Sequence, residues 1–336
     1  MKRPANQIII TGESGNTYAH GMVAVLGALG TEVDYDSVMG LSGVAFILQV
    51  DTSGPYLPGE VLDCAWWPND AWGFYLGLPV LSAAVGWELR NIHCDAAAYK
   101  ADPTSEYRRA FASLVESALH DGKPVLAEAD HCFIVTRTDG QVPPLLGYGT
   151  VGKSTSYQPE PIRINMYPWG LCIIGKKLPV SDSRSVDVTS LRHILALYHE
   201  TAQGANAPKT RFSGKRAWLE WERLLDKAMA NENKSNCMSP WDNNMLIHLR
   251  YNRASAVAYL QAMKNRHTGD TASALGAACV IYQSIVQELE KAELPYPGPT
   301  KGGISAYRAM VARVATLEAT AMAQLEVAVK SLEKTH

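Results

Sequence analysis

A histidine at the mouth of an apolar strand is the clearest candidate for chemistry in this sequence. His131 follows Asp130 and precedes the apolar run 132–135, so its ring can face a cleft while the strand stays anchored in a sheet. An imidazole in that position suits a general base, because its pKa lies near physiological pH. The alternative is a histidine at the edge of the sheet whose ring only forms a hydrogen bond with Asp130 or with a backbone carbonyl.

A second candidate site lies where a short strand meets a helix near the N-terminus. Ser14 belongs to the turn 12–15, between a predicted strand at 8–11 and a predicted helix at 17–29. The turn does not match a phosphate-binding loop, because no Lys-Ser/Thr pair follows at the required spacing. It does not match a nucleophile elbow either, since Asn16 stands where a small residue is needed. We interpret it as a strand-to-helix turn.

The start of this helix carries two further side chains that can do chemistry. Thr17 and His20 lie about one helical turn apart, so both can face the same cleft. A helix N-terminus stabilises anions and oxyanions, and His20 with His131 would form a catalytic pair or a ligand site there. Equally, His20 can sit on the solvated side of the helix.

The most unusual local composition lies at residues 63–72. Trp66, Trp67 and Trp72 fall within seven residues of one another. Exposed tryptophan is costly unless it binds something, so these rings form either the wall of a pocket or the interface between two halves of the chain. Cys64 beside them is a further candidate nucleophile, which a helix N-terminus would activate by lowering its pKa.

The composition of the chain limits the classes of partner that it is expected to bind. The chain has 336 residues with 31 basic and 33 acidic side chains, and a net charge of −2 provides no field to hold nucleic acid or an anionic membrane. No apolar run approaches the roughly 18–20 residues that cross a bilayer. Six cysteines occur without a Cys-x-x-Cys pair, and the N-terminus lacks an export signal. We therefore predict a cytoplasmic protein with reduced thiols, no metal site and no cofactor.

The composition changes near residue 180. Before it, a predicted helix at 104–121 and short β-rich runs predict an α/β domain over residues 1–180. After it, helical periodicity predicts an all-α bundle over residues 185–336, and the fold class is therefore α+β. The predicted strands are 8–11, 44–50, 88–93, 124–127, 132–137, 162–166 and 171–176. The last helix has an Ala-rich face that leaves room for self-association into a homo-oligomer.

The order of these features resembles the papain-like proteins related to butirosin biosynthesis protein H. The resemblance covers most of the chain as scattered short motifs. They are the helical segment 16–30, the helix-then-strand segment 35–46 containing Ser42-Gly43-Val44-Ala45-Phe46, the strand pair 122–126 and 131–135, and Phe212-Ser213-Gly214 followed by Trp218.

The resemblance implies a papain-like domain in which a cysteine at the start of the first long helix attacks an acyl group and a histidine on a facing strand acts as base. His131 matches that histidine, whereas the nucleophile position falls on Asn16 or Thr17. Two functions follow. The chain is an amide- or ester-processing enzyme, hydrolase or acyltransferase, that uses Thr17 or Cys64 as nucleophile. Alternatively, it is catalytically inactive and binds a small molecule, a peptide or a carrier-bound acyl group.

In both cases we expect one cleft to hold the ligand. The start of the first helix, from Ser14 to Thr17, would line it together with His131 and the tryptophan segment 66–72. Substrate contacts are expected from Ser14, Asn16, Trp66, Trp67 and Trp72.

Overall fold

Helices and strands are mixed along the chain, which confirms an α+β fold class. The computed structural model describes residues 16–51, 76–93, 105–128, 132–138, 145–149, 162–163, 170–200, 211–230, 243–292 and 301–334. The chain divides into two compact units, the first comprising Met1–Val38 with Leu78–Asp182 and the second Met39–Gly77 with Ser183–His336.

This division differs in one respect from the domains expected at 1–180 and 185–336. The units do separate after Asp182, but residues 39–77 group with the C-terminal helices and interrupt the first unit. Backbone pairing accounts for part of this grouping. Strand β1 (Gln49–Asp51) pairs antiparallel with β8 (Arg211–Ser213), and the two strands form a sheet of their own.

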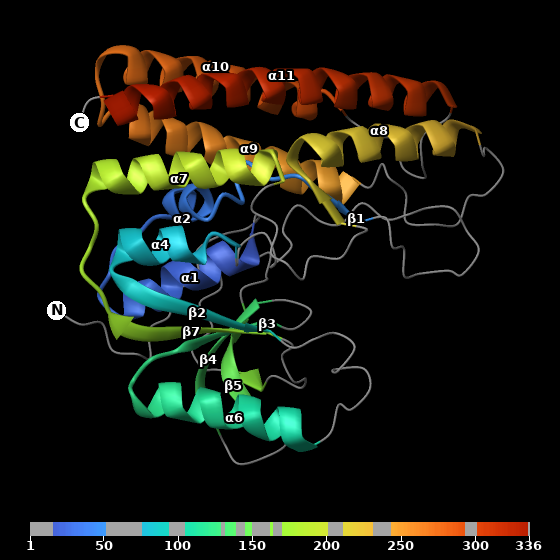
Figure 1. Cartoon of the computed structure of the whole chain (residues 1–336). Coiled ribbons are helices and arrows are strands. Elements are labelled where there is room, and N and C mark those ends of the chain that lie inside the picture. The colour runs from blue at the N-terminus through green and yellow to red at the C-terminus, as the bar shows by residue number, and fades with distance from the viewer. Residues whose placement is uncertain are drawn as a thin grey trace. The chain divides into compact units, whose positions relative to one another are not determined.

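The first unit contains a six-stranded sheet in the order β2-β7-β3-β4-β5-β6, and every neighbouring pair is antiparallel. In register, Leu126 lies opposite Ile134 on one side and Cys172 on the other. The strands are β2 (Trp87–His93), β3 (Val125–Glu128), β4 (Cys132–Thr138), β5 (Leu145–Gly149), β6 (Ile162–Arg163) and β7 (Gly170–Lys177). The helices of this unit include α1 (Thr17–Ala28), α4 (Leu78–Val85) and α6 (Ser105–His120), as Figure 1 shows.

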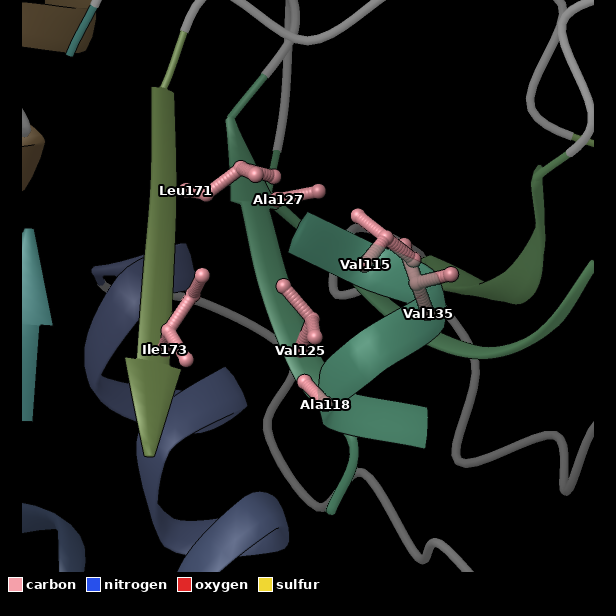
Figure 2. Packing of buried hydrophobic residues seen from close by; sticks show 7 residues of the cluster. All are labelled: Val115, Ala118, Val125, Ala127, Val135, Leu171 and Ile173. Carbon is pink, nitrogen blue, oxygen red and sulfur yellow. The ribbon is translucent and has the colours of Figure 1, made fainter. Parts of the chain in front are cut away.

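Strand alternation gives this sheet two buried faces. Val125 and Ala127 point to the face that α6 covers, and Leu126 between them is buried on the opposite face. Figure 2 shows the apolar cluster under α6, formed by Val115, Ala118, Val125, Ala127, Val135, Leu171 and Ile173. Helix α1 also packs against β3 and β4. The sheet therefore provides a rigid support for the start of α1.

The central strands match their predictions within one or two residues, because each is an apolar run bounded by turn residues. The strand predicted at 44–50 is shorter, since residues 44–46 form a turn and only Gln49–Asp51 is strand. This turn also replaces the strand implied by the family resemblance at Ser42–Phe46. The predicted strand at 8–11 and most of the one at 162–166 lie outside the described residues.

Apart from the β1–β8 pair, the second unit is built from helices. They are α7 (Ser183–Tyr198), α8 (Gly214–Ala230), α9 (Asn243–Lys264), α10 (Gly269–Glu290) and α11 (Lys301–Lys334), and the short α2 (Tyr35–Leu41) spans the division between the units. Helix α10 packs against both α9 and α11 (Figure 1). Thr271 near the start of α10 is bonded to Ser331 near the end of α11, and Glu288 is paired with Arg313. The two helices are therefore antiparallel.

The long helices of this unit bury apolar stripes whose residues recur at helical periodicity. The stripe on α10 is buried at Leu275, Ala278, Tyr282, Ile285 and Leu289. The stripe on α11 is buried at Met310, Val314, Ala321, Leu325, Val329 and Leu332, with Leu317 only partly covered. Among the described helices, none is long and apolar enough to span a membrane.

A fully buried ion pair connects three segments of the second unit. Arg253 on α9 donates from Nη2 to both carboxylate oxygens of Glu318 on α11, at 2.8 and 3.0 Å. Its Nη1 donates to the carbonyls of Ala45 and Ile47, at 2.8 and 3.2 Å. Burial raises the pKa of the Glu318 carboxyl, and Arg253 opposes that rise. Arg253 thereby satisfies two carbonyls of the segment that turns at residues 44–46, where a strand was predicted.

Glu318→Gln tests the importance of this pair. The substitution keeps the shape of the side chain but leaves Arg253 buried without its counter-charge, and we expect a loss of about 3–5 kcal/mol in the free energy of unfolding. Glu333→Gln on the same helix is the matched control. It removes the exposed pair with Arg192, so a loss of only about 0–1 kcal/mol is expected. Urea denaturation measures both, and equal losses would contradict the role assigned to the buried pair.

Candidate functional site

Asn16 is the N-cap of α1, and its side-chain oxygen is committed to that role. The backbone is extended there, with φ −77° and ψ 117°. Oδ1 accepts hydrogen bonds from the backbone N–H groups of Tyr18 and Ala19, both at 3.0 Å. These bonds satisfy two donors of the first turn that no helical carbonyl reaches. Asn16 is fully buried and is therefore a structural cap, not a nucleophile.

Helix α2 supplies the side chain that completes this cap. Gly30, at φ +78°, follows the end of α1, and the chain returns to place Tyr35 beside the start of the helix. The backbone N–H of Asn16 donates to Tyr35 Oη at 2.7 Å. The ring of His20 stacks on the ring of Tyr35, with centroids 4.2 Å apart and planes inclined by 23°.

His20 lies beside this cap. Its side chain is half-buried, with the ring stacked on that of Tyr35. The stacking follows from the geometry of α1, because residue 20 is one turn beyond the cap that Tyr35 contacts. Its role among the described residues is to pack against the cap.

Two hydrogen-bond donors come together at this cap. Burial raises the pKa of Tyr35 to about 12, the hydrogen bond from Asn16 opposes the rise, and nearby Asp36 adds to it. The phenol therefore keeps its proton at physiological pH. Nδ2 of Asn16 is buried and has no hydrogen-bond partner among the described residues. The start of α1 can accordingly offer an N–H and an O–H to an oxygen atom of a ligand.

The structure brings together only part of the predicted site. Asn16, Thr17 and His20 are described, and they share the first turn of α1. Thr17 is the first helical residue and is half-buried. The other candidates lie outside the described residues: Ser14, Cys64, Trp66, Trp67, Trp72 and His131. In the chain, His131 directly precedes Cys132, the first residue of β4, a strand on which α1 packs.

The described residues supply neither a reactive thiol nor a metal centre. Among the described cysteines, Cys132, Cys172 and Cys279 form no disulfide and are buried, and burial raises the pKa of Cys172 to about 12. A thiol in that state carries almost no thiolate at neutral pH. Within the described ranges, no group of three or more His, Cys, Asp or Glu side chains is arranged to hold a metal ion.

Two features of this site were not predicted from the sequence. Tyr35 belongs to it, although 19 residues separate it from Asn16, and nothing in the local sequence indicates that its hydroxyl reaches the cap. The capping role of Asn16 could have been predicted, because Asn is among the preferred residues directly before a helix. Compared with models of known protein families and with curated proteins, the chain gives no match.

Asn16→Ala tests the structural role of the cap. The change removes Oδ1 and leaves two first-turn N–H groups without an acceptor, so we expect a loss of about 0.5–2 kcal/mol in unfolding free energy. Asn16→Ser is the matched control, because its shorter side chain still provides a capping oxygen and should retain most of the stability. Chemical denaturation measures both variants. Equal stability of Asn16→Ala and the wild type would contradict the assignment.

Tyr35→Phe tests the second bond of the cap. It keeps the ring that stacks on His20 and removes only the hydroxyl, which leaves the buried N–H of Asn16 without an acceptor. A loss of about 1–3 kcal/mol is expected for such a donor. Thermal and urea unfolding measure the change. Unaltered stability would show that another group takes over the N–H.

Proposed function

We propose that this chain is a papain-like protein that binds a peptide or an acyl group at the start of α1 without forming a covalent bond to Asn16. The observation that carries the proposal is the state of the Asn16 side chain. Its oxygen caps the helix, whereas its Nδ2 is a buried donor without an acceptor. A residue in this state cannot attack an acyl carbon, but it can donate a hydrogen bond to one oxygen of a ligand.

The energetics of burial favour an oxygen-bearing ligand. A buried donor without a partner costs about 1–3 kcal/mol, and a ligand oxygen would remove that cost. The neutral hydroxyl of Tyr35 lies next to Asn16 and can donate to the same group. Carbonyl and carboxylate oxygens accept two such bonds, which selects amides, esters, thioesters and acids over ligands that only donate.

The arrangement of elements supports the papain-like part of the proposal. Helix α1 packs on β3 and β4 of an antiparallel sheet, and His131 precedes β4 directly in the sequence. The resemblance implies this order of helix and histidine strand. A ligand held at the first turn of α1 would then lie on the part of the fold where papain-like enzymes perform their chemistry.

An enzyme that transfers or hydrolyses the acyl group is the second candidate. It is favoured by Thr17, which carries a hydroxyl on the first turn of α1 and is half-buried, not enclosed like Asn16. A hydroxyl attacks an acyl carbon only when a base removes its proton, and His131 is the candidate base. In this case Asn16 Nδ2 would stabilise the oxyanion.

Asn16→Asp separates ligand binding from folding. The carboxylate keeps an oxygen that can accept both capping bonds, and it removes the Nδ2 donor. The probe is S-butanoyl pantetheine, a mimic of a carrier-bound acyl group, titrated calorimetrically into the full chain. We expect the variant to remain folded and to bind at least about tenfold more weakly, a difference of about 1.4 kcal/mol. Equal binding by a folded variant would exclude Asn16 as the contact.

Turnover distinguishes the two candidates. The same probe is followed for thioester cleavage in the wild type, in Thr17→Val and in His131→Ala. Binding without cleavage supports the binding protein. Cleavage that both variants abolish, with Thr17→Val still folded, supports the enzyme and contradicts the binding-only proposal. Failure of the wild type to bind this probe or an N-acetyl dipeptide amide would contradict both.

A further inference from the structure

Helix α10 carries no charge over most of its length. From Thr271 to Gln287 the sequence contains no acidic or basic residue. One side of this stretch is buried where α10 packs against α9 and α11, whereas Val280 on the other side is 60% exposed. The solvent face of a surface helix ordinarily carries charged residues, and the centre of a protein–protein interface is depleted of them. The exposed face of α10 therefore has the charge pattern of an interface.

The residues of this face follow one another at alternating steps of three and four, which places them along one line of the helix. Each of them is exposed or half-buried. They are Asp270, Ser273, Ala277, Val280, Ser284, Gln287 and Lys291, and they are called the outer stripe below. An acid begins the outer stripe, a base ends it, and Val280 lies at its centre.

The order of charges along the outer stripe is self-complementary. If a second copy of α10 lies antiparallel across a two-fold axis at Val280, residues at similar distances before and after Val280 face each other. Asp270 then faces Lys291 of the second copy, as a two-fold interface requires of a patch that contacts itself. Lys291 is paired with Glu288 in its own helix, but its side chain is 70% exposed and has donors left for a second acid. Glu290 is turned by about 100° from Lys291 around the helix and lies off the stripe.

The hydroxyl groups of the outer stripe already have acceptors within their own helix. Ser273 donates to the carbonyl of Gly269 at 3.0 Å, and Ser284 donates to the carbonyl of Val280 at 3.2 Å. Removing water from a polar group costs little when the group keeps a hydrogen bond. A second protein surface can therefore cover the outer stripe without leaving these two hydroxyls unsatisfied.

Helix α11 widens the face that the outer stripe begins. It runs antiparallel beside α10 (Figure 1), and its Arg313 is paired with Glu288. From Arg313 onward, exposed and uncharged residues recur along α11 at steps of three and four: Thr316, Thr320, Ala323 and Val327. The hydroxyls of Thr316 and Thr320 also donate to carbonyls of their own helix, both at 2.9 Å.

The two helices provide enough area for a stable dimer. The 22 residues of α10 span about 33 Å at 1.5 Å per residue, and two helices side by side are about 20 Å wide. This face therefore covers about 660 Å² on each copy and about 1,300 Å² in a dimer, within the range of about 1,200–2,000 Å² that specific interfaces bury.

We propose that this face binds a second copy of the same chain, with the two α10 helices antiparallel and meeting at Val280. The sequence alone placed self-association on the last helix. The self-complementary stripe lies on α10 instead, and α11 contributes the margin of the contact. The inference concerns the second unit and does not depend on the proposed function.

Val280→Glu tests the centre of this contact. Sedimentation of the full chain between about 1 and 100 μM measures the dissociation constant of the dimer. Two carboxylates would face each other at the two-fold axis, so we expect the dissociation constant to rise by at least about 100-fold. Val180→Glu is the matched control, because Val180 is 65% exposed and belongs to the first unit. It should leave the dimer unchanged, and circular dichroism checks that both variants are folded.

Charge reversal tests the antiparallel register. Asp270→Lys and Lys291→Asp each bring like charges together across the interface, and each should weaken the dimer by about tenfold. The double variant restores opposite charges and should regain most of the lost affinity. A contact between other faces of the chain gives no such recovery.

A dimer that Val280→Glu dissociates, that Val180→Glu preserves and that the double reversal restores supports the inference. A wild type that stays monomeric at about 100 μM overturns it, whatever other molecule the face binds. A folded Val280→Glu variant that still dimerises overturns it, as does a double reversal that is no stronger than the single ones. If Val280→Glu does not fold, the charge reversals decide alone, since both lie at exposed positions.

Discussion

Arg253 and Glu318 are both charged and both enclosed, so each needs the other once the second unit has folded. A buried pair of this kind adds little net stability, because desolvation offsets much of the attraction, but it penalises any arrangement that separates the partners. Here that penalty links α9 to α11 and, through the carbonyls of Ala45 and Ile47, links both helices to a turn some 200 residues earlier. The pair therefore helps to hold residues 45–47 within this unit, together with the pairing of β1 and β8.

In the described part of the first unit, buried polar groups are satisfied by hydrogen bonds between uncharged groups and not by an ion pair. Asn16 and Tyr35 together satisfy three backbone groups at the start of α1 or directly before it, and the sheet behind α1 is apolar on both faces. Capping and burial leave the Asn16 amide donor without an acceptor among the described residues. A buried donor without a partner costs free energy, and the proposal that a ligand oxygen binds at the start of α1 rests on this cost.

Features that depend on neighbouring residues were predicted from the sequence, whereas those that depend on contacts between distant residues were missed. The strands β3, β4 and β7, the helix α1 and the helical character of residues 185–336 were predicted, because periodicity and turn chemistry act over a few residues. The strand predicted at 44–50 was mostly wrong, since only Gln49–Asp51 is strand and the carbonyl of Ala45 in the preceding turn accepts from Arg253, a residue far away in the chain. Thr17 and Asn16 were singled out as possible site residues, whereas the contribution of Tyr35 was not foreseen.

The sequence by itself determined where the helices and central strands lie, which of their faces are apolar, and that the start of α1 carries polar side chains. Only the tertiary structure decided that Asn16 is a cap with an unsatisfied amide, that His20 stacks on Tyr35, and that residues 39–77 group with the C-terminal helices. The reason is physical. Local patterns record a residue's preference for a helix or a strand, whereas the partner of a buried polar atom is chosen by segments that are far away in the chain.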